Sequence, residues 1–132
     1  MFKPTDRQRT IFEVENKLPR NVQERLRSSW SEGFQARVLP ILLDAEHMFS
    51  ALYNNAKGRP NWSIARMLGI CVLQEIFDLD DQKALDCLAF DIRWQHSLGI
   101  TPEESYLSRR SLVDFRSRLV SYDPKMKMVR AV

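Results

Sequence analysis

Apolar residues recur every three or four positions through most of the chain, a pattern that predicts helices. The clearest stretch starts at Asn61 or Ser63 and runs to about Phe77. Its apolar positions follow the spacing of one helix face: Ile64, Met67, Leu68, Cys71, Val72 and Ile76. Val, Ile and Thr form no alternating runs, and the chain has only 4 glycines. We therefore predict an all-α fold, a compact multi-helix bundle with a helix-turn-helix-like C-terminal half.

Three further helices are predicted after this stretch. A short turn at residues 78–80 leads to Asp80, which can cap a helix with a stripe of Ala84, Leu85, Leu88 and Ala89. The next apolar group is Ile92, Trp94 and Leu98, and Gly99 can end that helix. Ser108 can cap a last helix to about Tyr122, with Leu112, Phe115 and Leu119 on one face.

The N-terminal part predicts shorter helices separated by prolines. The expected segments are a helix from Thr5 to Glu15 ended by Pro19, a helix capped by Asn21 that carries Val22, Leu26 and Trp30 with Gly33 near its end, and a helix from Ala45 to Tyr53 capped by Asp44. Pro40 is expected to interrupt the apolar run before Asp44, and residues 54–60 form a loop by composition. We divide the chain into an N-terminal helical segment (1–57), a second helical region (58–122) and a basic tail or linker (123–132).

Charge is distributed unevenly, although the net charge is only +3 and the sequence pI is about 9.1. From Arg109 to the end there are seven Lys or Arg residues against two acids, whereas from Gln74 to Asp91 six acids face one base. A protein with a basic end and an acidic middle is expected to present the basic end to a polyanion.

The last predicted helix is the leading candidate for contact with double-stranded DNA. Arginine suits this role because its planar fork bridges phosphate oxygens or guanine acceptors. The candidate contacts on this helix are Arg109, Arg110, Ser111, Asp114, Arg116, Ser117 and Arg118. Lys57 and Arg59 in the preceding loop are further candidates for phosphate contact. The alternative is an ordinary solvated basic face.

The helix pair joined by the turn at 78–80 has the turn length of a helix-turn-helix. Its second helix is acidic, with Asp81, Asp86 and Asp91, and phosphates would repel these carboxylates. We therefore expect this helix to brace the last one rather than to enter a groove.

The other residue types with possible chemistry have structural interpretations. Asp78, Asp80 and Asp81 could hold a metal ion, but a helix start explains two of the three. His47 and His96 lack the spacing of zinc ligands, and Cys71 and Cys87 lie on apolar stripes, as expected of core residues in a reducing cytoplasm. Trp30, Trp62 and Trp94 could stack on bases but are expected mainly in the core. We expect no cofactor and no membrane contact.

Several short motifs occur in order along the chain. They are Gly58-Arg59-Pro60, Phe77-Asp78-Leu79-Asp80-Asp81, Phe90-Asp91-Ile92-Arg93-Trp94, Ser97-Leu98-Gly99-Ile100 and Ser111-Leu112-Val113-Asp114-Phe115-Arg116-Ser117-Arg118-Leu119, with Phe2-Lys3-Pro4 near the start. In these motifs the segment from Gly58 to Leu119 resembles the N-terminal domain of InsH-type bacterial insertion-sequence transposases. The family usually has a His-Ser-Thr-like stretch where this chain has Arg109-Arg110-Ser111.

The resemblance implies a helical domain that binds transposon ends, followed in the family by an RNase H-like domain. Three carboxylates of that second domain hold divalent metal ions such as Mg²⁺ for DNA cleavage. Those catalytic positions have no counterpart in this sequence, so we expect this chain itself not to be an enzyme. The parent protein would be a DDE transposase.

Two functions remain open from the sequence. The first is recognition of a transposon terminal repeat as duplex DNA. The second is a helical dimerisation or protein-interaction module, or a truncated inhibitor of transposition. Its interface would be formed by Ile11, Phe12, Val22, Leu26 and Trp30, and it would make the protein a homo-oligomer.

Overall fold

The computed structural model describes residues 18–53 and 62–122, and every regular element within these ranges is a helix. The first range holds α2 (Arg20–Arg27), α3 (Trp30–Gly33), the π-helical segment η1 (Phe34–Val38), α4 (Leu39–Ala45) and the 3₁₀ helix η2 (Glu46–Tyr53). The second holds α5 (Ile64–Ile76), α6 (Asp81–Phe90), α7 (Ile92–Leu98), the short 3₁₀ helix η3 (Pro102–Glu104) and α8 (Arg109–Tyr122). The predicted all-α fold is confirmed.

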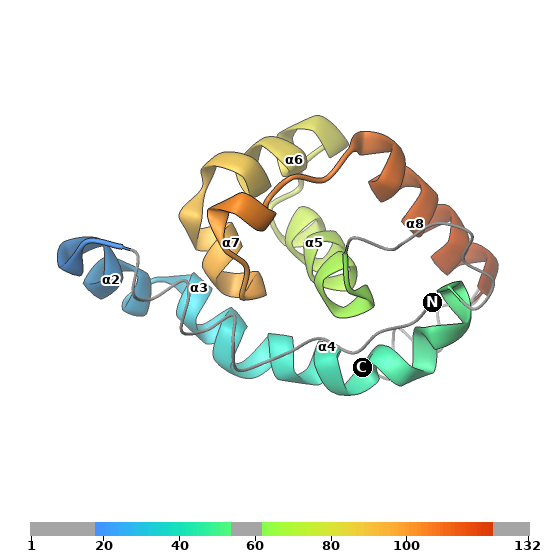
Figure 1. Ribbon diagram of the computed structural model, residues 1–132, viewed down its shortest axis with the longest axis horizontal. Coiled ribbons are helices and arrows are strands. Elements are labelled where there is room, and N and C mark those ends of the chain that lie inside the picture. The colour runs from blue at the N-terminus through green and yellow to red at the C-terminus, as the bar shows by residue number, and fades with distance from the viewer. Residues whose placement is uncertain (1–17, 54–61, 123–132) are drawn as a thin grey trace.

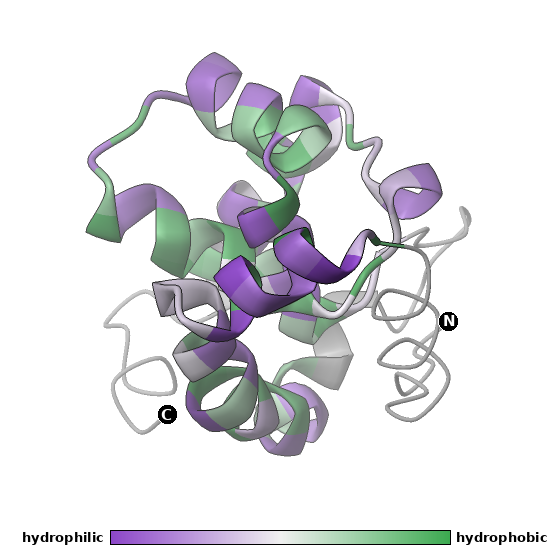
Figure 2. Ribbon diagram, turned by 90° about the vertical axis from the view of Figure 1, so that its left-hand side faces the viewer, coloured by the Kyte–Doolittle hydropathy of each residue, from purple (hydrophilic) through white to green (hydrophobic). Residues whose placement is uncertain are grey.

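Helix α5 lies at the centre of the fold. Figure 1 shows α4 and the segments next to it along one side, α6 and α7 on another, and α8 closing the ring. Purple and green alternate along the helices of Figure 2, as expected of amphipathic helices that turn one side inward. The hydrophobic core combines residues of both ranges: Phe34, Leu42 and Phe49 from the first, and Ile70, Leu98 and Phe115 from the second.

The helix boundaries predicted after residue 62 are confirmed by the caps. Ser63 Oγ accepts a hydrogen bond from the amide of Arg66 (3.2 Å), and Asp80 Oδ1 accepts one from the amide of Lys83 (2.8 Å). Gly99 ends α7 in the left-handed conformation with φ 67°, where a side chain would be strained. These signals are local in sequence, so the pattern alone located them.

The predicted start and end of the helix capped by Asn21 are wrong. Helix α2 begins at Arg20 after Pro19, so Asn21 lies inside the helix and does not cap it. The helix stops at Arg27, and Ser29 caps α3 by accepting a hydrogen bond from the amide of Ser31 (3.2 Å). Trp30 therefore opens a new helix, where its ring packs against Phe77 with centroids 5.1 Å apart.

The prediction that Pro40 interrupts the helical run is wrong, because the chain stays helical through this residue. A proline ring clashes with the carbonyl four residues earlier in a regular helix. Here the π-helical segment η1 comes directly before it, and Pro40 falls in the first turn of α4, where its missing N–H is tolerated. Asp44 consequently lies within α4 rather than at a helix start, and residues 46–53 form a 3₁₀ helix.

The two predicted segments at the chain's ends, the helix from Thr5 to Glu15 and the tail 123–132, lie outside the described residues. The predicted loop at 54–60 lies outside them too. Within the described ranges no helix is long and apolar enough to cross a membrane.

Two glycines are expected to respond oppositely to replacement by alanine. A Cβ on Gly69 would lie 2.5 Å from Leu98 Cδ2, and Leu98 is fully buried, so the new methyl has no room. A Cβ on Gly33 meets nothing within 4 Å, and its φ of −62° is ordinary for a helix. We expect Gly69→Ala to lower the free energy of unfolding by about 1 kcal/mol, since overpacking outweighs the gain in helix propensity.

Gly33→Ala, the matched control, should raise it by about 0.5–1 kcal/mol. Urea denaturation of the two variants measures both changes. A stabilised Gly69→Ala variant would show that α5 and α7 are less closely packed than described.

Candidate nucleic-acid interface

Helix α8 is held in place by its own apolar face and by a serine cap. Leu112, Phe115 and Leu119 are buried, and the helix packs against α6 and η2. Ser108 Oγ accepts a hydrogen bond from the amide of Ser111 (3.1 Å) and donates one to Ser111 Oγ (2.9 Å). The predicted cap is therefore present, and the polar face of α8 points away from the core.

Arg116 is the most firmly held of the predicted DNA contacts. Its Nη1 and Nη2 donate to Asp81 Oδ1 and Oδ2 at 2.6 and 2.7 Å, a bidentate pair across to the first turn of α6. Gln74 on α5 donates to the same carboxylate (2.8 Å) and accepts from Arg116 Nη1 (3.3 Å). These partners join α5, α6 and α8, so Arg116 serves the packing of the interface helix.

The electrostatics of this cluster follow from its hydrogen bonds. The bonds from Arg116, and then from Gln74, lower the pKa of Asp81 from its ordinary value of 3.8 to about 2. The same pair raises the pKa of Arg116. Burial raises the pKa of the neighbouring Cys71 thiol from 9.0 to about 11, so this thiol is unreactive at neutral pH.

Arg118 is also engaged within α8. Its Nε lies 3.0 Å from Asp114 Oδ2, one helical turn earlier, and both side chains are about half exposed. Such an exposed pair is weak, about 0.3–0.5 kcal/mol, and can rearrange when a stronger partner arrives. Arg118 and Asp114 thus stay on the surface, but part of the Arg118 charge is balanced by its neighbour.

Arg109 and Arg110 are exposed at the first turn of α8 and make no hydrogen bond or ion pair among the described residues. The outward face of α8 continues from Arg110 through Val113 to Ser117, which recur at helical spacing. Val113 is 41% exposed, so its methyl groups lie on this outward face. This face therefore combines cationic, polar and methyl groups.

The acidic residues of α6 have individual roles that the sequence did not resolve. Asp81 binds Arg116, and Asp91 caps α7 through the amide of Arg93 (2.9 Å) while pairing with its side chain. Asp86 accepts from Gln82 (3.0 Å) at the surface. Among the described residues, no group of three or more His, Cys, Asp or Glu could hold a metal ion.

The structure shows a second set of arginines that the sequence analysis overlooked. Arg25, Arg27 and Arg37 are exposed on α2 and η1. The sequence contains the signal for them, since α2 carries three arginines in eight residues. Lys57 and Arg59, the predicted loop contacts, lie outside the described residues.

The tryptophans predicted to be mainly core residues are packed inside. Trp94 is buried, and Trp62 is buried with its Nε1 donating to the carbonyl of Tyr106 (2.8 Å). Trp30 is half buried against Phe77. Of the residues proposed for a dimer interface, Leu26 is also buried within the chain's own fold.

Comparison with known proteins places this helical fold in a family. A family model described as Transposase domain (DUF772) matches residues 15–118. No curated protein and no solved structure matches the chain. The matched range includes all of the helices from α2 to α7 and most of α8. Because the match covers well over half of the sequence, this chain belongs to that family of transposase domains.

Proposed function

We propose that the chain binds the terminal repeat of an insertion element as duplex DNA, with α8 as the helix that faces the DNA. The observation that carries the proposal is the pair Arg109 and Arg110, which are exposed at the N-terminal turn of an anchored helix and form no hydrogen bond or ion pair among the described residues. The backbone amides of that turn add partial positive charge. Both the arginine side chains and the helix end therefore attract a phosphate.

The outward face of α8 suits base reading as well as phosphate contact. Arg110 can bridge the acceptors of guanine, and Val113 can pack against the methyl group of thymine. Ser117, one further turn along, can donate or accept at either base edge. Arg116 has a different role in this proposal, because its bidentate bond to Asp81 fixes the angle at which α8 leaves the core.

The DNA-cleaving chemistry is assigned to a separate catalytic domain that uses Mg²⁺, as the resemblance to insertion-sequence transposases implies. In this proposal the role of the chain is to hold the element's end, and α5 and α6 brace the contact helix. The acidic surface of α6, including Asp86, would face away from the phosphates because like charges repel.

Replacing Arg110 tests the assignment. Arg110→Ala is expected to weaken binding to a terminal-repeat duplex about 10-fold, since a good arginine–base or arginine–phosphate contact contributes about 1–3 kcal/mol. The salt dependence of binding should also fall by about one unit of slope if a phosphate is lost. Fluorescence anisotropy over a range of salt concentrations measures both quantities.

Lys83→Ala is the matched control, because it removes one exposed positive charge from α6. Its affinity should stay within about 2-fold of the unchanged protein, because the proposal assigns α6 to bracing α8 and not to contact with the DNA. Equal losses in the two variants would mean that α8 is not the contact helix and that binding depends on overall charge alone.

A further inference from the structure

A buried histidine lines a small recess on the side of the fold formed by α2 and α7. The side chain of His96 is only 3% exposed, and its Nε2 lies 2.8 Å from Glu32 Oε2 on α3. Its other ring nitrogen, Nδ1, is buried and has no hydrogen-bond partner within residues 18–53 and 62–122. A buried polar atom without a partner costs free energy, so its presence points to a group that binds there.

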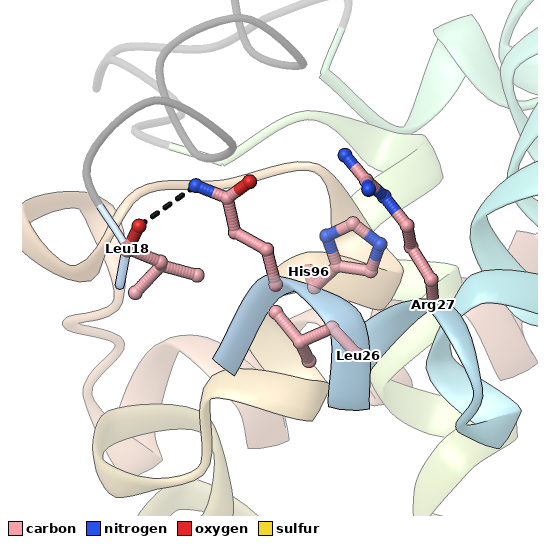
Figure 3. Close-up of a pocket in the computed structure, with 5 residues that line it drawn as sticks. Leu18, Leu26, Arg27 and His96 are labelled. Atoms are coloured by element: carbon pink, nitrogen blue, oxygen red, sulfur yellow. Dashed lines mark hydrogen bonds between the residues drawn. The ribbon is translucent and has the colours of Figure 1, made fainter. Parts of the chain in front are cut away.

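The recess beside the ring is small and mostly apolar, and one exposed arginine borders it. Among the described residues it is lined by Leu18, Gln23, Leu26, Arg27 and His96, and it has room for about one water-sized oxygen. Figure 3 shows the ring of His96 next to Leu26 and Arg27. The guanidinium of Arg27 forms no hydrogen bond or ion pair among the described residues.

The donors and acceptors around the recess determine which charge a bound group can carry. Glu32 is an acceptor, so the Nε2 of His96 carries the proton and donates to it. When the ring is cationic, Nδ1 carries a proton too and donates into the recess. Arg27 offers only donors, and the amide nitrogen of Gln23 is occupied by the carbonyl of Leu18 (2.7 Å). With the ring cationic, an anionic oxygen accepts hydrogen bonds from both donors, whereas a cation would be repelled by Arg27.

We propose that the recess between α2 and α7 binds one oxygen of a phosphate group, with Arg27 and His96 Nδ1 as the donors. Free phosphate and a DNA backbone phosphate present the same oxygen. Binding of a DNA backbone phosphate rests on the proposed DNA-binding function. It would give the fold a second phosphate contact, separate from the one on α8. Glu32 positions the ring by holding its opposite nitrogen.

The first arm of the test uses inorganic phosphate and the full chain. Nitrogen-15 NMR of the histidine rings is recorded over a range of pH while phosphate replaces chloride at constant ionic strength. We expect a saturable shift of the His96 ring signals. Arg27→Ala should weaken it about 5-fold or more, as expected for a lost charge-assisted contact.

Arg25→Ala is the matched control, because both arginines are exposed in the last turn of α2 and only Arg27 lines the recess. This variant should retain the shift. Both substitutions are at the surface, and equal melting temperatures would show that the fold is intact. No saturable shift of His96 with either phosphate or DNA, or equal effects of the two substitutions, would overturn the proposal and leave a bound water as the partner of Nδ1.

The second arm titrates a short duplex instead of phosphate. A shift of His96 that Arg27→Ala weakens and Arg110→Ala does not remove would identify the DNA backbone as the source. A shift with phosphate and none with DNA identifies free phosphate, so the recess stands as a phosphate site separate from DNA binding. Loss of binding in Arg110→Ala alone concerns α8, so the two proposals can fail independently.

Discussion

Phe115→Ala is expected to lower the free energy of unfolding by about 3–5 kcal/mol, because it leaves a cavity under the centre of α8. Phe115 is 1% exposed and lies between Leu112 and Leu119 on the buried face. Small domains are stable by only about 5–15 kcal/mol, so this change would remove a large part of the total. Urea denaturation followed by circular dichroism gives the loss directly.

Val113→Ala is the control on the same helix. Its side chain is 41% exposed, so the loss should be within about 0.5 kcal/mol. The two variants separate the anchoring face of α8 from the face assigned to DNA: Val113→Ala should weaken DNA binding without unfolding the protein. Comparable destabilisation by both substitutions would mean that α8 is oriented differently from the structure described.

Asp81→Asn is expected to lower the free energy of unfolding by about 2 kcal/mol. The substitution keeps the size of the side chain but removes the negative charge of the carboxylate, which accepts hydrogen bonds from Nη1 and Nη2 of Arg116. Charge-assisted hydrogen bonds contribute about 1.5–3 kcal/mol, and partial exposure of Arg116 reduces the value toward the middle of that range. Thermal and urea denaturation at neutral pH measure the difference.

The stabilising effect of Asp81 should disappear in acid over a defined range. Its pKa is lowered by folding, from 3.8 to about 2. A carboxyl whose folded pKa is depressed stabilises the fold above its unfolded pKa, and this contribution is lost as the pH falls through the folded pKa. The stability difference between the unchanged protein and Asp81→Asn should therefore be constant above about pH 5 and shrink between about pH 4 and pH 2.

Asp86→Asn serves as the control for that titration, because Asp86 lies on the same helix with only a surface hydrogen bond to Gln82. It should cost less than about 0.5 kcal/mol. A difference between the unchanged protein and Asp81→Asn that persists undiminished at about pH 2 would show that the carboxylate–guanidinium pair does not contribute as described.

The C-terminal helices could be predicted from sequence because their boundaries depend on neighbouring residues. Ser63, Asp80 and Gly99 each act on backbone groups within a few positions, so the pattern contains the whole signal. The N-terminal part could not be predicted in the same way. Proline at position 40 normally ends a helix, and only the π-helical turns before it let the path continue.

The candidate interface was only partly predictable for a related reason. Arg109, Arg110, Arg116 and Arg118 are equivalent by sequence, since all lie on one short basic helix. What separates them is tertiary: the partner of Arg116 lies 35 residues earlier, at the start of another helix. The recess at His96 depends likewise on α2 and α7, and nothing in the spacing of Arg27 and His96 indicated that they meet.

The π-helical segment η1 also sets the number of residues between the part of the chain that contacts α7 and the part that contacts α5. Before it, Ser31 donates to the carbonyl of Arg93, and within it Gln35 donates to the carbonyl of His96 (2.7 Å), so this side faces α7. After it, Leu42 and Leu43 turn toward the core around α5. Deleting one residue would rotate one half against the other by about 100°. Substitutions at the surface of η1 are therefore tolerable, whereas a single-codon deletion would leave either α7 or α5 without its partner.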